Sequence, residues 1–240
     1  MKGFFLFLGI ILVITTDAQE TQKKEKQKRI SIGVNFSPDY DFRTLKNNDG
    51  SSSSDFVIKS RNDIETAKFG YATGLSVNVR FSKILAFETG ILYSNKGYRT
   101  GEIDLYYPLP DPSSPTQYKS LYSFHYLDIP LKLNVTTGKG KVKLIASAGL
   151  AANFLIKESE TVTQIYSNGD SKKEKQSSTS DYNEFNISPL ISLGLEYRLK
   201  NSFSIRAEPT FRYGVLKIID QPVTEYLWNA GLNIGIYYDL

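Results

Sequence analysis

Apolar and polar side chains alternate with a period of two along most of the chain from Ile30 onward. The clearest run is 228–240, where Trp, Ala, Leu, Ile, Ile, Tyr and Leu on one parity alternate with mostly small or polar residues on the other. Such alternation indicates β-strands with one apolar face. Comparable runs predict eight strands, near 30–42, 67–81, 84–99, 121–135, 141–157, 184–199, 202–217 and 225–239.

The connections between these predicted strands alternate between short and long. Tight turns are expected at 82–83, 136–140 and 200–201. The other connections run through 43–66, 100–120 and 158–183, with a shorter one at 218–224. Short turns at one end and long loops at the other are typical of bacterial outer-membrane barrels, whose short turns face the periplasm. The pattern therefore predicts an all-β protein, an eight-stranded antiparallel up-and-down transmembrane β-barrel.

Aromatic residues on the apolar parity fall near both ends of the predicted strands, with aliphatic residues between them. Trp and Tyr collect at the two interfaces between membrane and water, so this spacing predicts two aromatic girdles. The candidate interface aromatics are Phe69, Tyr71, Tyr93, Tyr213 and Trp228 toward the loops, and Tyr197, Phe203 and Tyr238 toward the turns.

Charged residues of both signs occupy the polar parity, which would face the interior of the barrel. They are Arg80, Glu88, Asp128, Lys132, Glu196, Arg198, Arg206, Glu208 and Arg212. An eight-stranded barrel is about wide enough to be filled by its own side chains, and an isolated buried charge is costly. We therefore expect an ion network that plugs the lumen. The alternative is a catalytic acid–base pair drawn from Asp128, Glu196 or Glu208.

Glycine and proline bear on the geometry of the strands. Glycines on the polar parity, such as Gly231, suit a narrow interior where backbones crowd. Pro130, Pro189 and Pro209 lie inside predicted strands, although a closed barrel has no free edge on which a missing N–H is harmless. We therefore expect β-bulges at these three prolines.

The N-terminal segment has the features of a secretory signal peptide. A charged start at Met1-Lys2 precedes an apolar run over 4–14 and small residues before a predicted cleavage after Ala18. That run is about half the roughly 20 apolar residues of a membrane-spanning helix. The predicted organisation is a signal peptide at 1–18, a charged leader at 19–29 and an outer-membrane barrel domain at 30–240.

Composition narrows the chemistry further. The chain has no cysteine and one histidine, which excludes thiolate sites and multi-histidine metal clusters, so we expect neither a metal site nor a cofactor. The lysine-rich leader contributes much of the net charge of +4. Because export favours a solvated leader, we expect no nucleic-acid partner. His125 and Asp128 differ by three positions, which places them on opposite faces of a strand and argues against a catalytic dyad.

The long loop at 100–120 contains the best candidate for partner binding. Tyr106 and Tyr107 are followed by Pro108 and Pro110 in an extended, proline-rich stretch. Loops on a rigid scaffold are where binding residues usually lie. The simpler alternative is a mobile surface loop that the prolines stiffen.

Two segments, GILYSNKG at 90–97 and YLDIPLKL at 126–133, are similar to the PorT-like outer-membrane β-barrel family of Bacteroidota. The resemblance extends over roughly 30–240, including the closing GIYY at 235–238. It implies an outer-membrane location and makes Pro130 a family feature. A founding member is linked to the secretion of surface proteases, whereas most members have no known activity. The chain departs from many such barrels by ending Asp239-Leu240 instead of in an aromatic residue.

These observations predict a non-enzymatic, monomeric barrel of the cell outer membrane, surrounded by outer-membrane lipid. Its outer loops would bind an envelope or secretion protein, or support envelope integrity. Two alternatives remain open on sequence alone. One is a barrel enzyme acting on lipid or peptide at the outer rim, and the other is a soluble periplasmic ligand-binding barrel.

Overall fold

The computed structural model describes residues 29–109, 113–177, 182–200 and 202–240. The predicted signal peptide and all but the last residue of the charged leader lie outside the described residues. Within them the chain forms ten strands and one helix. Their bounds are β1 Ile30–Asn47, α1 Ser52–Ile64, β2 Glu65–Arg80, β3 Leu85–Thr100, β4 Ile103–Asp104, β5 Gln117–Thr137, β6 Val142–Ile165, β7 Ser171–Gln176, β8 Phe185–Lys200, β9 Phe203–Tyr213 and β10 Val223–Asp239.

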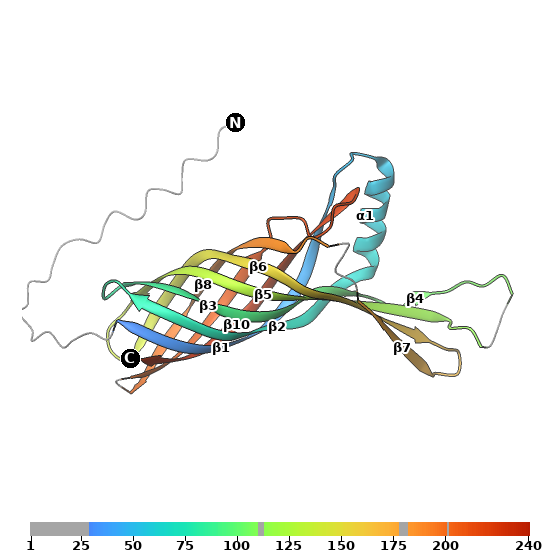
Figure 1. The fold of residues 1–240 in the computed structure, drawn as a ribbon. Coiled ribbons are helices and arrows are strands. Elements are labelled where there is room, and N and C mark those ends of the chain that lie inside the picture. The colour runs from blue at the N-terminus through green and yellow to red at the C-terminus, as the bar shows by residue number, and fades with distance from the viewer. Residues whose placement is uncertain (1–28, 110–112, 178–181, 201) are drawn as a thin grey trace, which may run out of the picture.

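Eight of the strands form a closed ring of antiparallel pairs. The order is β1, β2, β3, β5, β6, β8, β9 and β10, and β10 pairs with β1 to close the ring. The short strands β4 and β7 lie outside the ring, on β5 and β6 respectively. The antiparallel sheet and the chain order of its ring strands agree with the pattern in the sequence. The connections β2–β3, β5–β6 and β8–β9 define the turn end of the ring, and α1, β4 and β7 lie at the opposite, loop end (Figure 1).

In the ring, polar side chains are buried and apolar side chains are exposed, which is the reverse of a water-soluble protein. Along β1 the polar residues Ser31, Asn35 and Asp39 are buried, whereas Val34 and Phe36 between them are exposed. The same alternation runs through β9 and the second half of β10. A sheet that exposes its apolar face needs an apolar solvent around it, because exposing that much apolar surface to water would be strongly unfavourable.

The expectation of one long loop over 43–66 is wrong, because this segment continues β1 to Asn47 and then forms α1. The helix begins where Ser51 caps it, with the Ser51 hydroxyl accepting a hydrogen bond from the Ser54 N–H at 3.1 Å. Asp55 in the first turn lies favourably in the helix dipole. No helix in the described part of the chain is long and apolar enough to cross a membrane.

The other two long connections are also more ordered than expected. β5 begins at Gln117 and β6 continues to Ile165, so the two strands extend past the ring as a paired ribbon. With β4 and β7 on either side, residues 103–104, 117–122, 160–165 and 171–176 form a four-stranded projecting sheet (Figure 1). The prediction of eight strands is therefore right for the ring but misses β4 and β7.

The expected bulges at Pro130, Pro189 and Pro209 are also wrong. The register shifts occur elsewhere, at Ala67/Tyr71, His125/Tyr126 and Arg198/Lys200. Pro130 remains in register with Ala151, and pairing between β3 and β5 is interrupted only around it before resuming in the same register. In an antiparallel sheet each N–H bonds to one neighbour only, so proline weakens one ladder without displacing the chain.

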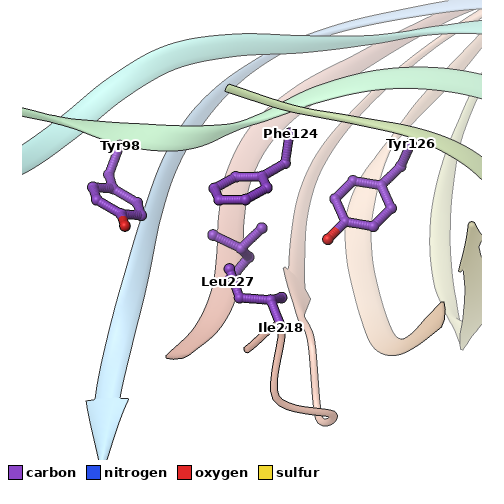
Figure 2. Close-up of a cluster of buried hydrophobic side chains, with 5 residues drawn as sticks. All are labelled: Tyr98, Phe124, Tyr126, Ile218 and Leu227. Atoms are coloured by element: carbon purple, nitrogen blue, oxygen red, sulfur yellow. The ribbon is translucent and has the colours of Figure 1, made fainter. Parts of the chain in front are cut away.

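An apolar core lies inside the loop end of the ring. Tyr98, Phe124, Tyr126, Ile218 and Leu227 are buried together, and we call them the inner apolar cluster. Figure 2 shows their side chains directed toward one another from β3, β5, β10 and the connection before β10. The sequence carried a signal for them, because Tyr98 shares the parity of Glu88 on β3, and Phe124 and Tyr126 share the parity of Asp128 on β5.

Candidate functional site: the ring interior and its loop end

Glu88 lies at the centre of an ion cluster that crosses the interior of the ring. Its carboxylate accepts hydrogen bonds from Lys132 at 2.7 Å and from Arg206 at 2.8 Å. Arg206 also donates to Glu196 at 2.8 Å, and its guanidinium lies 4.1 Å from the centre of the Tyr237 ring. All five side chains are buried or nearly so, so each charge in this cluster has a partner of opposite sign in place of water.

Glu208 extends this cluster toward the loop end. It accepts hydrogen bonds from Ser192 at 2.8 Å and from Ser147 at 3.2 Å, and Lys132 lies 4.0 Å away. Five of the nine predicted interior charges therefore meet in one cluster: Glu88, Lys132, Glu196, Arg206 and Glu208.

Asp239 organises the charges at the turn end. It pairs with Arg80 at 2.9 Å and more loosely with Arg198 at 3.8 Å, and it accepts a hydrogen bond from Ser31 at 2.6 Å. Arg80 and Arg198 were expected to join an interior network, whereas Asp239 was not singled out. Its position on the polar parity of the last strand was the available signal.

Two further ion pairs lie above the Glu88 cluster, toward the loops. Arg212 pairs with Asp39 at 3.2 Å, and Asn229 donates to the same carboxylate at 2.6 Å. Asp128 pairs with Lys96 at 3.1 Å and accepts a hydrogen bond from Asn153 at 2.6 Å. Asp39 and Lys96 were missed from the sequence, although both share the polar parity of their strands. The nine predicted charges thus fall into four groups.

A fifth charged group fastens α1 to the loop end, and sequence reasoning missed it. Glu65 accepts hydrogen bonds from Arg43 and Arg61, both at 2.6 Å, and Arg61 also pairs with Glu225 at 2.7 Å. Tyr98 of the inner apolar cluster donates to Glu225 at 3.0 Å. We call Arg43, Arg61, Glu65 and Glu225 the helix latch.

Electrostatics keeps Arg61 of the helix latch charged. Burial alone would lower the pKa of Arg61, but its hydrogen bonds to Glu65 and the charge of Glu225 outweigh burial and raise the pKa above its ordinary value. The available sequence signal was the spacing of Arg61 and Glu65, four residues apart, as in helix ion pairs.

The predicted interface aromatics lie on the outer surface of the ring. Toward the loops, Trp228 packs against Tyr40, Phe42 and Phe211, with ring centres 6.1 to 6.3 Å apart. Phe69 contacts the other side of Tyr40. Tyr71 contacts Tyr93, and Tyr213 is the register partner of Trp228.

Toward the turns, the rings of Phe203 and Tyr238 pack with their centres 4.9 Å apart. Tyr197, near the turn end of β8, is exposed, as is Leu199 on the same face. The predicted aromatics thus occur in two groups at opposite ends of the ring strands.

His125 and Asp128 lie on opposite sides of the sheet. The His125 ring stacks on the Tyr93 ring, with their centres 5.8 Å apart. A hydrogen bond of 2.5 Å joins His125 Nδ1 and the Tyr93 hydroxyl. Asp128 points inward to Lys96. The two side chains therefore do not form a catalytic dyad. No group of three His, Asp or Glu residues in the described ranges is arranged to hold a metal ion.

The candidate partner loop begins at the projecting sheet. Tyr106 is 93% exposed and Leu109 is 82% exposed, and Tyr107 and Pro108 are also exposed. Pro110, the fourth residue proposed for this site, lies outside the described residues. The hydrogen bond from the Leu105 N–H to the Thr116 carbonyl, at 2.8 Å, anchors the base of the loop next to β4.

A closed antiparallel ring with an apolar outer wall and paired charges inside defines the class of outer-membrane barrel proteins. The chain belongs to the outer membrane protein beta-barrel domain family, whose model matches residues 16–220. The protein accordingly lies in the cell outer membrane.

Solved structures of similar fold include Neisserial surface protein A, with 13% identity over 88% of this chain and 97% of that chain and a TM-score of 0.44. OprG from Pseudomonas aeruginosa has 12% identity over 88% and 97%, with a TM-score of 0.47. The outer membrane protease OmpT from Escherichia coli has 8% identity over 90% and 98%, with a TM-score of 0.44. Similarity at this level assigns no function. No curated protein matches the chain.

Proposed function

We propose that the protein is a non-enzymatic, monomeric, eight-stranded up-and-down transmembrane barrel that works through its outer loops. In this proposal the lumen is plugged, and the projecting sheet and α1 bind an envelope or secretion protein. The observation that carries the proposal is the contrast between the two regions. Most charges inside the ring are paired with one another, whereas large apolar side chains at the loop end are exposed.

The plugged lumen is supported by successive layers of side chains across the ring. From the turn end these are the Asp239 group, the Glu88 cluster, the Asp39 and Asp128 pairs, and the inner apolar cluster. A solute passing through would have to separate several buried ion pairs, and breaking a buried pair costs about 3–5 kcal/mol.

Partner binding at the loop end is supported by apolar side chains in contact with water. Phe56 on α1 is 70% exposed, in addition to the exposed Tyr106 and Leu109 after β4. Exposed large apolar groups on a rigid scaffold are typical of surfaces that bind other proteins. The helix latch and the register of β5 with β6 supply that rigidity.

We also propose that the protein is a PorT-like barrel of Bacteroidota. The two segments that carry the resemblance, 90–97 and 126–133, lie side by side on β3 and β5, where Leu92 pairs with Asp128. Segments that are distant in the chain thus form one continuous part of the wall. This resemblance favours protein secretion among the envelope roles that outer loops could serve.

Solute flux tests the plugged lumen. Purified protein in liposomes is expected to give no swelling with small sugars, because the interior charges hold one another in place. An open porin reconstituted at the same density is the positive control. Swelling at a rate comparable with the porin would overturn the plugged-lumen part of the proposal.

Site-specific photo-crosslinking tests partner binding at the loop end. A photoreactive residue at Tyr106 is expected to give one discrete protein adduct in intact cells. The same residue at Lys139, in the β5–β6 turn at the opposite end of the ring, is expected not to give that adduct. Replacement of Phe56 by Ser should weaken a Tyr106 adduct if α1 shares the partner. Absence of any adduct from Tyr106 would contradict a role of this loop in partner binding.

A further inference from the structure

A small open recess of about 30 Å³ lies at the turn end of the ring, far from the exposed loop end. Its walls come from the turn-end residues of β2, β3, β5, β6, β8 and β9 and from the β2–β3 turn. This is the end of the ring opposite α1 and the projecting sheet (Figure 1). Because short turns face the periplasm in this class of protein, the recess opens to that side.

The recess carries an excess of positive charge. Five cationic side chains line it, against the single carboxylate of Glu196. The cationic side chains are Arg80, Lys83, Lys143, Arg198 and Arg206. Arg206 is paired with Glu196 and Glu88, and Arg80 is paired with Asp239. The remaining three, Lys83, Lys143 and Arg198, have no carboxylate within 3.5 Å among the described residues.

Lys143 and Arg198 present the donors that are not engaged. Lys143 is half-buried, and its ammonium forms no hydrogen bond or ion pair with any residue that the structure describes. Arg198 has only the 3.8 Å contact with Asp239, which is too long for a hydrogen bond. In the rest of the interior, by contrast, most charged groups have close partners.

The two donors lie on the same face of neighbouring strands. Lys143 of β6 is the register partner of Glu196 of β8, and Arg198 follows Glu196 by two positions. Diagonal neighbours of this kind are roughly 7–8 Å apart at the backbone, within reach of a common ligand for two long side chains. Arginine and lysine together supply the directed donors and the charge that bind phosphate groups.

We propose that this recess is a binding site for a phosphate oxyanion, held between the Lys143 ammonium and the Arg198 guanidinium. Lys83 at the mouth adds attraction without a fixed contact. The phosphate is either free inorganic phosphate in the periplasm or the headgroup of a phospholipid in the inner leaflet. This site lies at the opposite end of the ring from the proposed partner surface. A negative result for one proposal therefore leaves the other unaffected.

Titration calorimetry on the full chain tests the site, in an uncharged detergent that contains no phosphate. The two probes are inorganic phosphate and dihexanoylphosphatidic acid below its micelle concentration. We expect saturable binding of one molecule of at least one probe. The double variant Lys143→Gln with Arg198→Gln should weaken that binding by about tenfold or more, since two charge-assisted hydrogen bonds are lost.

The matched control is Lys139→Gln, which removes the same charge from an exposed position in the β5–β6 turn that does not line the recess. It should leave the affinity unchanged. Lys143→Gln alone breaks no ion pair of the structure, so its effect on binding does not depend on the stability of the double variant. Each variant is first checked for the folded state by its heat-dependent shift in electrophoresis.

The two probes separate the sources of the ligand. Binding of inorganic phosphate that the double variant loses supports the site with a soluble ligand. Binding of the lipid alone, again lost in the double variant, supports it with a phospholipid headgroup. Saturable binding of neither probe, or binding that the double variant retains at full affinity, would overturn the proposal.

Discussion

The free-energy cost of burying a charge inside the ring depends on how many oppositely charged or polar partners surround it. Arg206 illustrates this, because it bridges Glu88 and Glu196 and lies over the ring of Tyr237. Taking a guanidinium out of water is costly, and the two carboxylates offset that cost only while all three charges remain. Removal of the central cation should therefore be more damaging than removal of an exposed one.

Arg206→Met tests the Glu88 cluster. The change leaves the buried Glu196 carboxylate without its close partner, so we expect the free energy of unfolding to fall by about 3–5 kcal/mol. Urea unfolding in detergent, followed by tryptophan fluorescence, measures it. Lys172→Met, which breaks an exposed pair with Glu174, is the control and should change little. Equal effects of the two substitutions would contradict a stabilising role for the cluster.

Gly231 of β10 shows how tightly the interior is filled. A Cβ atom at this position would lie 1.8 Å from the Asp39 carboxylate, which holds Arg212 and Asn229. Gly231→Ala should therefore displace Asp39 and lower the free energy of unfolding by about 1–3 kcal/mol.

The control is Gly101→Ala, where the nearest atom to an added Cβ is 3.7 Å away. It should leave the same unfolding curve almost unchanged. A Gly231→Ala protein as stable as the Gly101→Ala protein would show that the space around Asp39 is not restrictive.

At the scale of elements, the period-two pattern was enough to predict the ring strands because it depends on the solvent on each side of the wall. It could not predict α1, whose sequence SSSDFVIKSRNDI carries no long apolar face and is held by the charged helix latch. It could not predict β7 either. All six residues of β7 are exposed, so neither face is buried and apolar and polar residues need not alternate.

The interior was predicted only in part for a related reason. Parity identifies which residues face inward, but partners come from strands far apart in the chain. Asp39 and Arg212, on β1 and β9, meet across β10 and could not be matched from the sequence alone. The bulge expected at Pro130 is absent because a gap in one hydrogen-bond ladder is enough to accommodate a residue without an N–H.

The helix latch leads to a prediction about α1. Arg61→Ala removes the hydrogen bonds to Glu65 and Glu225, so α1 should separate more readily from the loop end. Chymotrypsin added to intact cells should then cleave after Phe56 several times faster than in the unchanged protein. Lys59→Ala, an exposed change on the same helix, is the control. Cleavage rates that match the control would exclude the latch as the restraint on α1.

For the whole molecule, the decisive property is the solvent that surrounds the ring. The outer wall is apolar along its strands and has aromatic groups at both ends, whereas most of the buried charged side chains of the ring pair with one another. Lipid around the ring explains both the exposed Leu, Ile and Val side chains and the buried ion clusters. It also agrees with membership of the outer-membrane barrel family. A packed protein interior around those side chains would explain none of them.

Spin labelling at Ile234 tests this most directly, because the chain has no cysteine and a single introduced one is labelled selectively. Ile234 is 40% exposed on the outer wall of β10, and Lys172 on β7 is the control in water. In reconstituted membranes the label at Ile234 is predicted to be relaxed strongly by oxygen, which concentrates in lipid, and weakly by a water-soluble nickel chelate. The label at Lys172 should show the reverse. A label at Ile234 that is shielded from both reagents, or relaxed mainly by the nickel chelate, would contradict the account.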